Sequence, residues 1–327
     1  MQKYVNIATV QLPGPSLVTI GNFDGLHRGH QALLRQMVDL AVQQWNEGEL
    51  ERAPQCGLIT FDPHPRTVLR PDEPHYLLTT PDERLALAAA QGIDFGVIQC
   101  FSREIAALDA RAFMTLLKEH LGVVGLVVGP DFALGRGRQG DLPRLQELGE
   151  ELGYTLHVMA PIAWEGKAVR SSFIRAALQQ GDVSEAADLL GWTYTVTGTV
   201  VPGDRRGRQI GVPTANLQVP PNKLLPADGV YATRTKLHVK DSWVSFNSVT
   251  NLGVRPTVDG LHHRVETHLL DFPAIAPDTD QTGDLYGQSL IVEFIARLRG
   301  EERFSGLNEL VAQIQRDIAQ ARELLSK

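Results

Sequence analysis

The sequence is poor in cysteine and has no long apolar run free of polar residues. Cysteine occurs only at Cys56 and Cys100 among 327 residues, and no Cys/His pairs stand at the spacing of a zinc site. These absences exclude a disulfide scaffold and a zinc domain. The longest uncharged apolar stretch, residues 4–23, is interrupted by asparagine, glutamine, glycine and prolines. It therefore predicts neither a membrane span nor the core of a signal peptide, and the expected location is the cytoplasm.

The chain also lacks an excess of positive charge. Its 31 lysines and arginines are outnumbered by 38 aspartates and glutamates, for a formal net charge of −7. The basic residues do not accumulate on any long segment, which argues against nucleic acid or an anionic membrane as a partner. The apolar content of 43% and the length are sufficient for a folded protein of about two domains.

Short apolar runs alternate with helical patterns in the first half of the chain. Continuous apolar strands, each followed by a helix, predict a doubly wound, Rossmann-like parallel sheet covered on both faces. Ligands of such sheets bind beyond the carboxyl ends of the strands. The predicted strands are 17–20, 57–61, 95–99, 126–128 and 156–159, and the predicted helices are 29–45, 81–91, 110–120 and 141–152.

The pattern changes near Gly191, where many short strands are separated by turn residues without intervening helices. This arrangement predicts an antiparallel β-barrel or a sandwich, closed by one terminal helix over residues 306–325. A helix-like stretch at 183–190 marks the expected seam between the halves. The strand candidates are 193–201, 229–235, 243–249, 265–270 and 289–298.

The first candidate binding motif lies at residues 21–30, between a predicted strand and a predicted helix. Its three glycines permit tight turns, and the helix start presents free N–H groups to an anion. His27 and His30 stand at the same helix start. Together these features predict a phosphate cradle that lacks the spacing of a P-loop.

Residues 27–30, His-Arg-Gly-His, match the His-x-Gly-His motif of the α/β nucleotidyltransferases. The wider segment 21–30 resembles the FMN adenylyltransferase (FAD synthetase) domain of bacterial bifunctional riboflavin kinase/FAD synthetases. Three further motifs of that domain resemble residues 61–65, 128–135 and 170–175. The resemblance implies transfer of an adenylyl group from ATP to FMN, with release of pyrophosphate.

This resemblance implies a set of site residues in the first half. Two of its positions depart from the family pattern: Leu134 replaces an aromatic residue, and Arg170 stands where the first serine usually lies. Taken without the resemblance, the hydroxyls and arginine at 171–175 equally fit ordinary helix capping. The implied residues are His27 and His30 for catalysis, Gly21, Phe23, Asp24, Gly29, Ser171, Ser172 and Arg175 for ATP and its phosphates, and His64 and Asp131 for flavin or nucleotide.

A second candidate binding motif begins at residues 203–211. This segment contains regularly spaced glycines and is basic, although the chain as a whole is acidic. A cationic, glycine-rich loop fits a triphosphate. Thr214 and Asn216 follow, two residues apart, so an extended segment directs both side chains to one face. Their oxygens suit Mg²⁺ held jointly with phosphate, although a basic surface loop before a polar strand is the plainer alternative.

Residues 213–217, Pro-Thr-Ala-Asn-Leu, match the signature of riboflavin kinase, and residues 226–231, 251–257, 266–272 and 284–287 resemble its other segments. The last two are separated by an apparent insertion at 273–283. The resemblance implies a six-stranded barrel in which Glu266 is the general base for the ribityl hydroxyl of riboflavin. Taken without the resemblance, Glu266 also fits a strand-surface carboxylate paired with Arg264 or His268. The implied ligands are Gly203, Gly207, Arg208, Gly211, Thr214 and Asn216 for ATP, Thr214 and Asn216 for Mg²⁺, and Asp228, Tyr231 and Arg255 for flavin.

The resemblance covers residues 17–322 and implies a bifunctional enzyme. Residues 1–185 are expected to adenylylate FMN to FAD, and residues 186–327 to phosphorylate riboflavin to FMN. The expected partners are ATP, riboflavin and FMN, and the expected state is a monomer or weak homo-oligomer. Two alternatives remain open at this point: a flavin-binding or regulatory protein with a decayed transferase site, and an adenylyltransferase that carries a binding barrel.

Overall fold

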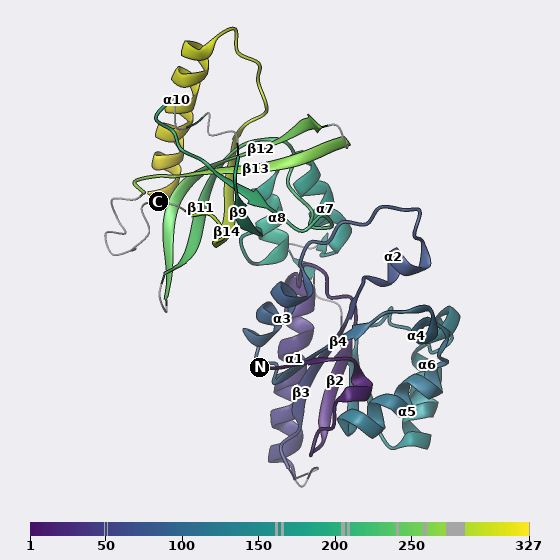
Figure 1. Ribbon diagram of the computed structural model, residues 1–327. Coiled ribbons are helices and arrows are strands. Elements are labelled where there is room, and N and C mark those ends of the chain that lie inside the picture. Colours follow the sequence, from purple (N-terminus) through teal and green to yellow (C-terminus); the bar gives the residue numbers. More distant parts are fainter. Residues whose placement is uncertain are drawn as a thin grey trace. The chain divides into compact units, whose positions relative to one another are not determined.

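The computed structural model describes residues 1–48, 50, 52–160, 163–164, 167–203, 207, 210–239, 242–257, 260–272 and 285–326, without the side chains of 163, 167, 168, 255–257 and 260–263. The chain forms two compact units, Met1–Ser171 and Ser172–Lys327 (Figure 1). The division precedes the expected boundary after residue 185, because α7 (Ser171–Gln180) and α8 (Val183–Leu190) pack with the second unit. There the Leu178 carbonyl accepts from the Ala227 N–H, and the Gln180 carbonyl from Arg297.

A six-stranded parallel sheet forms the centre of the first unit, in the order β1-β4-β3-β2-β5-β6. Strand β2 is buried at every residue, as its continuous apolar sequence predicts. Its neighbours are β3 and β5, so the loops that follow these three strands emerge at one edge of the sheet. The strands are β1 (Gln2–Val5), β2 (Ser16–Ile20), β3 (Gln55–Asp62), β4 (Phe95–Cys100), β5 (Val123–Val128) and β6 (Thr155–Val158).

Helices cover both faces of this sheet (Figure 1). On one face, α1 (Arg28–Asn46) and α3 (Pro81–Ala89) bury Leu34, Met37 and Leu85. On the other face, α5 (Ala110–Leu121) and α6 (Leu142–Leu152) bury an equally apolar set. The chain therefore has the doubly wound architecture that its alternating pattern predicts.

A closed antiparallel barrel forms the centre of the second unit, in the order β10-β13-β12-β11-β14-β9. The structure thus decides for a barrel over a sandwich. Closure is aided by the length of β12, which has 16 residues and pairs with both β11 and β13. The strands are β9 (Thr195–Val201), β10 (Ala215–Gln218), β11 (Gly229–Val239), β12 (Ser242–Thr257), β13 (Gly260–Leu269) and β14 (Ser289–Arg299).

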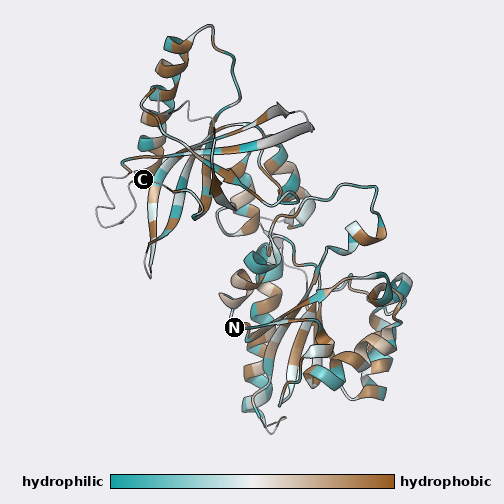
Figure 2. Ribbon diagram, viewed as in Figure 1, coloured by the Kyte–Doolittle hydropathy of each residue, from teal (hydrophilic) through white to brown (hydrophobic). Residues whose placement is uncertain are grey.

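The terminal helix α10 (Leu307–Leu325) lies against the outside of the barrel, over β11, β12 and β14. Its Ala321 and Leu325 are buried with Ala232 of β11. Figure 2 shows hydrophobic and hydrophilic residues alternating around this helix, in agreement with the predicted apolar stripe.

The sequence patterns missed several short elements. Strand β1 is mostly exposed and lies at the edge of the sheet, so it carries little apolar signal. Strand β10 has only four residues and was expected only as an extended segment. Further elements without a prediction include α2 (Pro65–Leu69), α4 (Arg103–Ala107), β7 (Ala163–Trp164) and β8 (Lys167–Ala168).

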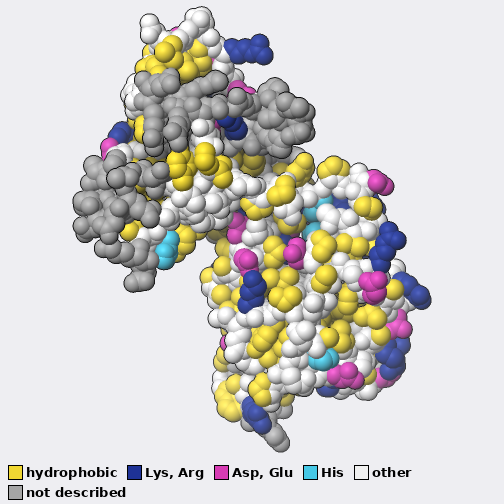
Figure 3. Space-filling view, viewed as in Figure 1, with side chains coloured by type: hydrophobic (Ala, Val, Ile, Leu, Met, Phe, Trp, Pro, Cys, Tyr) yellow, Lys and Arg dark blue, Asp and Glu magenta, His cyan; other side chains and the backbone are white. Residues whose placement is uncertain are grey.

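Surface charge and helix hydropathy are consistent with what the composition predicts. On the face drawn in Figure 3, lysines and arginines of the first unit are interspersed with acidic side chains. None of the helices in the described part of the chain combines the length and apolar character needed to cross a membrane. The expected insertion at 273–283 lies outside the described residues.

Replacement of Gly57 by alanine should destabilise the first unit by about 1–3 kcal/mol, because the core is too densely packed to admit another methyl group. A Cβ atom at Gly57 would lie 2.1 Å from the ring of Phe95, which is fully buried. Calorimetry of the unfolding transition would measure the effect. Gly14→Ala is the control, because a Cβ there meets nothing within 4 Å. Equal transition temperatures for the two variants would contradict this account of the core.

Candidate functional sites

The loop after β2 brings the two predicted histidines into direct contact. His27 caps α1, and its Nδ1 accepts a hydrogen bond from the His30 N–H at 3.4 Å. The two imidazole rings stack with centroids 3.7 Å apart, and the Phe23 ring meets His30 edge-on at 5.0 Å. The structure therefore places this aromatic cluster at the N-terminus of α1, where free N–H groups favour an anion.

Burial keeps both histidines neutral at physiological pH. It lowers the pKa of His27 to about 4. Burial also places the pKa of His30 well below its usual value, and the nearby His27 and Arg84 act in the same direction. Among the described residues, Nδ1 of His30 has no hydrogen-bond partner. His27 and His30 can therefore contribute neutral polar ring atoms to a ligand. The positive potential that attracts an anion comes from the N-terminus of α1.

Asp24 holds the loop in shape from inside the protein. Its carboxylate accepts hydrogen bonds from the backbone N–H groups of Leu78 and Thr79 at 3.1 and 2.9 Å, and from the Thr79 hydroxyl at 3.2 Å. Arg84 lies 3.7 Å away, and both charged side chains are almost fully buried. The structure thus directs this predicted phosphate-site carboxylate toward the neighbouring segment and α3.

Arg84 was not predicted as part of this network. Its guanidinium donates to the Thr60 hydroxyl at 2.6 Å and to the Thr79 carbonyl at 3.2 Å. The sequence does contain a signal: on a helix, Arg84 shares the buried face with Leu85 and Ala88. A charge on such a face must be paired, which makes it a candidate for a structural role near a site.

The remaining predicted residues of the first unit lie on loops or at helix starts. Ser171 begins α7, and its hydroxyl donates to the Asp24 carbonyl at 3.0 Å. His64 caps α2 by accepting from the Arg66 N–H at 3.1 Å, and Asp131 is exposed after β5. The segments that carry His64 and Asp131 follow β3 and β5, so they emerge at the same sheet edge as the loop after β2.

Two glycines predicted for the adenylyl-transfer site have little space for a side chain. A Cβ at Gly21 would lie 3.0 Å from the Phe23 ring, and a Cβ at Gly29 would lie 3.3 Å from the His27 ring. Ser172 and Arg175 continue α7 and belong to the second unit.

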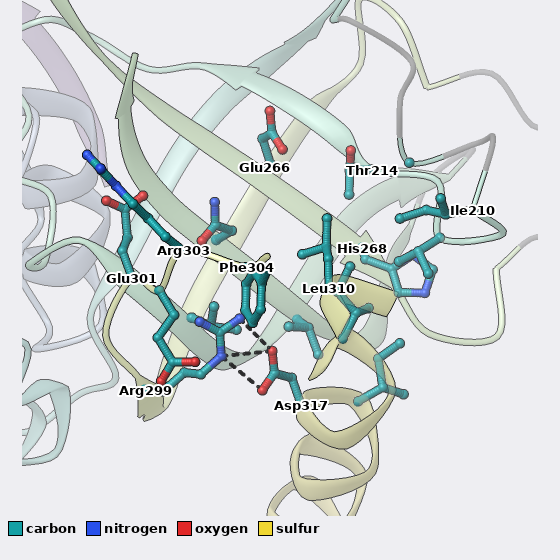
Figure 4. Close-up of a pocket in the computed structure, with 18 of the residues that line it drawn as sticks. Ile210, Thr214, Glu266, His268, Arg299, Glu301, Arg303, Phe304, Leu310 and Asp317 are labelled. Atoms are coloured by element: carbon teal, nitrogen blue, oxygen red, sulfur yellow. Dashed lines mark hydrogen bonds and ion pairs between the residues drawn. The ribbon is translucent and has the colours of Figure 1, made fainter. Parts of the chain in front are cut away.

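A cavity of about 1030 Å³ opens in the second unit, between the outer face of the barrel and α10 (Figure 4). One part of its lining is polar and the other is apolar, so it suits a ligand with an aromatic body and a polar chain. The polar and charged lining includes Thr214, Asn251, Glu266, His268, Arg299, Glu301, Glu302, Arg303 and Asp317, and the apolar lining includes Val230, Val249, Phe304, Leu307, Leu310, Ile314 and Ile318.

Glu266 lies at the polar side of this cavity, on β13. Its register partners are Asn216 on β10 and Asn251 on β12. One carboxylate oxygen, Oε1, accepts a hydrogen bond from Arg264 at 2.7 Å. Thr214 also lines the cavity, so the structure brings together the predicted base and one predicted metal ligand.

The segment before β10 is shaped by glycines. A Cβ at Gly203 would lie 2.2 Å from the amide nitrogen of Asn216, so the asparagine side chain lies directly over this glycine. The Gly207 carbonyl accepts from the Val212 N–H at 2.8 Å, and Gly211 has a φ of 75°, which favours glycine. Arg208 lies outside the described residues.

The side-chain oxygens of Thr214 and Asn216 suit a Mg²⁺ ion that is held together with a nucleotide. No group of three or more His, Cys, Asp or Glu side chains suited to a metal occurs in the described part of the chain. A hydroxyl and an amide supply hard oxygen ligands without such a carboxylate cage. In addition, the His268 ring bonds the Pro213 carbonyl at 2.7 Å and fixes the segment that carries Thr214.

Two predicted flavin ligands do not line this cavity. Tyr231 is fully buried in the barrel with its ring against Phe294, and burial raises its pKa to about 12. Because side chains alternate along β11, Val230 faces the cavity and Tyr231 faces inward. The backbone of Asp228 accepts a hydrogen bond from Arg297, and the side chain of Arg255 is not described.

The floor of the cavity contains a mostly buried ion pair that was not predicted. Arg299 donates hydrogen bonds to both oxygens of Asp317 at 2.9–3.1 Å (Figure 4). Gln313 donates to the same carboxylate at 2.7 Å. The Arg299 guanidinium also lies 5.6 Å from the Phe304 ring. An acidic residue on the otherwise apolar stripe of α10 was the available signal.

Comparisons with known proteins cover both units. Residues 10–173 match the FAD synthetase family model, and residues 190–325 match the riboflavin kinase model. The bifunctional riboflavin kinase/FMN adenylyltransferase of Escherichia coli K12 is 38% identical over 308 residues, which span 94% of this chain and 92% of the relative. The proteins of that description from Pseudomonas fluorescens and Bacillus subtilis are 37% and 31% identical; each alignment spans 94% of this chain, and 92% and 91% of the respective relative.

A solved structure shares the fold of the whole chain. It is a protein described as a macrolide-efflux protein from Streptococcus pneumoniae, with a TM-score of 0.83 and 27% identity. The match covers 98% of this chain and 99% of that one. The similarity therefore extends over both the parallel sheet and the barrel.

Acidification from pH 6.5 to about 4 should destabilise the first unit, with a slope of up to about 1.4 kcal/mol per pH unit from His27. In this window the unfolded chain binds a proton that the folded chain does not, so this contribution to stability is complete above 6.5 and lost toward 4. Urea unfolding at several pH values would measure the slope. His27→Asn preserves a capping side chain and should make the slope shallower. Identical slopes would contradict the neutral-histidine assignment.

Replacement of Asp317 by alanine should destabilise the second unit by about 3 kcal/mol, because the mostly buried Arg299 would lose the carboxylate that pairs with it. Thermal unfolding followed by circular dichroism would measure the loss. The matched control is Asp271→Ala, which breaks the exposed pair with Arg322 and should change the transition little. An equal effect of both variants would contradict the importance of burial.

Proposed function

The chain belongs to the bifunctional riboflavin kinase/FMN adenylyltransferase family, and from this premise we propose which residues perform each reaction. The enzyme phosphorylates riboflavin with ATP to give FMN, and it adenylylates FMN with a second ATP to give FAD and pyrophosphate. The observation that carries this function is the presence of both family matches in one chain, over the barrel and the parallel sheet respectively.

For the kinase reaction we propose Glu266 as the general base. The ribityl 5′-hydroxyl would transfer its proton to Glu266 as its oxygen bonds to the γ-phosphorus and the bridging oxygen departs with ADP. Two features support this role: the carboxylate faces the cavity, and Thr214 lines the same cavity. The apolar lining around Phe304 and Leu310 would bury the isoalloxazine ring.

Thr214 and Asn216 are the proposed ligands of Mg²⁺. Bound with ATP, this ion supplies charge neutralisation at the transferring phosphate. The neighbouring glycines, Gly203, Gly207 and Gly211, would let the backbone approach the nucleotide closely. Asn216 lies directly over Gly203, so any larger residue at 203 would displace this proposed Mg²⁺ ligand.

For adenylyl transfer we propose that His27, His30 and the start of α1 bind the ATP phosphates. FMN already carries an anionic phosphate, so the chain needs to align the groups and stabilise negative charge rather than supply a covalent nucleophile. Gly21, Gly29 and Phe23 would shape this pocket, with Asp24 as the anchor of the loop. Ser171, Ser172 and Arg175 are proposed for the outer phosphates, and His64 and Asp131 for the FMN or adenine side.

We further propose that the enzyme acts in the cytoplasm as a monomer or weak homo-oligomer. Its partners are then small molecules, namely ATP, riboflavin and FMN. The net charge of −7 and the mixed surface charges support the absence of a nucleic-acid partner.

The function is tested by incubating the purified full chain with riboflavin, ATP and Mg²⁺ and separating the flavins by chromatography. FMN and FAD should both form. Absence of both products would reject the enzymatic function. FAD formed from supplied FMN, without FMN formed from riboflavin, would reduce it to an adenylyltransferase with a binding barrel.

Single substitutions should separate the two reactions. Glu266→Gln should lower FMN formation by at least about a hundredfold, because the hydroxyl loses its proton acceptor, while FAD formation from supplied FMN continues. His30→Ala should give the opposite result. Both activities would be measured on each variant by the same chromatography. If Glu266→Gln retained normal FMN formation, another group would be the base.

A further inference from the structure

We propose that Arg264 is a positioning residue for the kinase reaction, which holds one oxygen of Glu266 so that the other can receive the substrate proton. This inference rests on the proposed role of Glu266 as base. It concerns a residue that does not line the cavity and that would act on the reaction through its ion pair with the base.

The pair is built into the geometry of β13. Arg264 and Glu266 are two residues apart on a strand, so their side chains project from the same face. Arg264 donates from NH1 to Oε1 of Glu266 at 2.7 Å, and the two side chains are 32% and 24% exposed. Such a contact between ionised groups is directional and is stronger than a neutral hydrogen bond.

The carboxylate of Glu266 is held asymmetrically. Oε1 receives the Arg264 hydrogen bond, whereas Oε2 has no hydrogen-bond partner among the residues that the structure describes. Rotation about the last bond of a glutamate side chain is broad, so an unanchored carboxylate samples many orientations. Anchoring one oxygen reduces this freedom and leaves the other available at the cavity, which is what a general base requires.

The surroundings favour a cation at position 264. Its register partner on β12 is Gly253, and a Cβ there would lie 2.2 Å from a carboxylate oxygen of Glu301. The Glu301 carboxylate therefore occupies the space over the residue that faces Arg264 across the sheet. Negative charge on this face of the sheet therefore comes from Glu301 as well as from Glu266, which favours a cation at position 264 over a neutral side chain.

The energy of a partly exposed ion pair is modest, so the expected effect is a change of several-fold rather than loss of activity. If the pair instead withdrew Glu266 from the substrate, removal of Arg264 would accelerate the reaction. The direction of the change in kcat therefore distinguishes positioning from sequestration.

The test is steady-state FMN formation by the full chain with riboflavin, ATP and Mg²⁺. Arg264→Met should lower kcat by about three- to fivefold and leave the KM for ATP within about twofold. Arg264→Lys restores a cation and should recover most of the lost kcat. A purely structural role for Arg264 would not give this rescue together with an unchanged KM for ATP.

The matched control is Lys236→Met, which breaks an ion pair of 2.6 Å with Glu293 on the same barrel, away from the cavity lining. It should leave kcat unchanged. Quenching of riboflavin fluorescence should show that every variant still binds flavin, and therefore that the barrel is folded.

Three results would overturn the proposal: an unchanged kcat in Arg264→Met, an increased kcat, or no recovery in Arg264→Lys. Failure of the underlying assignment is recognised separately, because Glu266→Gln would then retain FMN formation. An inactive Glu266→Gln combined with a fully active Arg264→Met would reject the positioning role and retain Glu266 as base.

Discussion

A charge removed from water must be paired, and this requirement shapes both units of the chain. In the first unit, the buried Arg84 and Asp24 join α3 to the loop that carries His27 and His30. In the second unit, Arg299 and Asp317 join β14 to α10 at the floor of the cavity. The members of each pair also make hydrogen bonds to neighbouring groups, so loss of one partner would disturb the attached site as well as the fold.

The two units present different groups at their proposed phosphate sites. The first presents neutral, stacked imidazoles at a helix terminus, where backbone N–H groups supply the positive potential. The second combines the glycine-shaped segment before Asn216 with a carboxylate at a large, partly apolar cavity. These differences correspond to the chemistry: adenylyl transfer to FMN starts from an anionic acceptor, whereas phosphorylation of riboflavin starts from a hydroxyl that must lose a proton.

Sequence patterns predicted the long helices and buried strands well, and the short or exposed elements poorly. Helix α1 and strand β2 are strongly periodic or continuously apolar, so their existence was evident. The exposed edge strand β1 carries no such signal. Alternation along β11 turns the ring of Tyr231 into the barrel and Val230 toward the cavity. That direction depends on which face of the strand closes the barrel, which local sequence does not encode.

The sequence by itself determined the class of each half and the chemistry available at its motifs, because periodicity and residue type are local properties. His27 and His30 at a helix start, and Thr214, Asn216 and Glu266 in a β-rich half, were identifiable without coordinates. Only the tertiary structure decided which groups meet: the register that sets Glu266 between Asn216 and Asn251, the anchoring of Asp24 by Thr79, and the pairing of Arg299 with Asp317. These contacts join residues distant in the chain, so they follow from strand pairing and burial rather than from any local pattern.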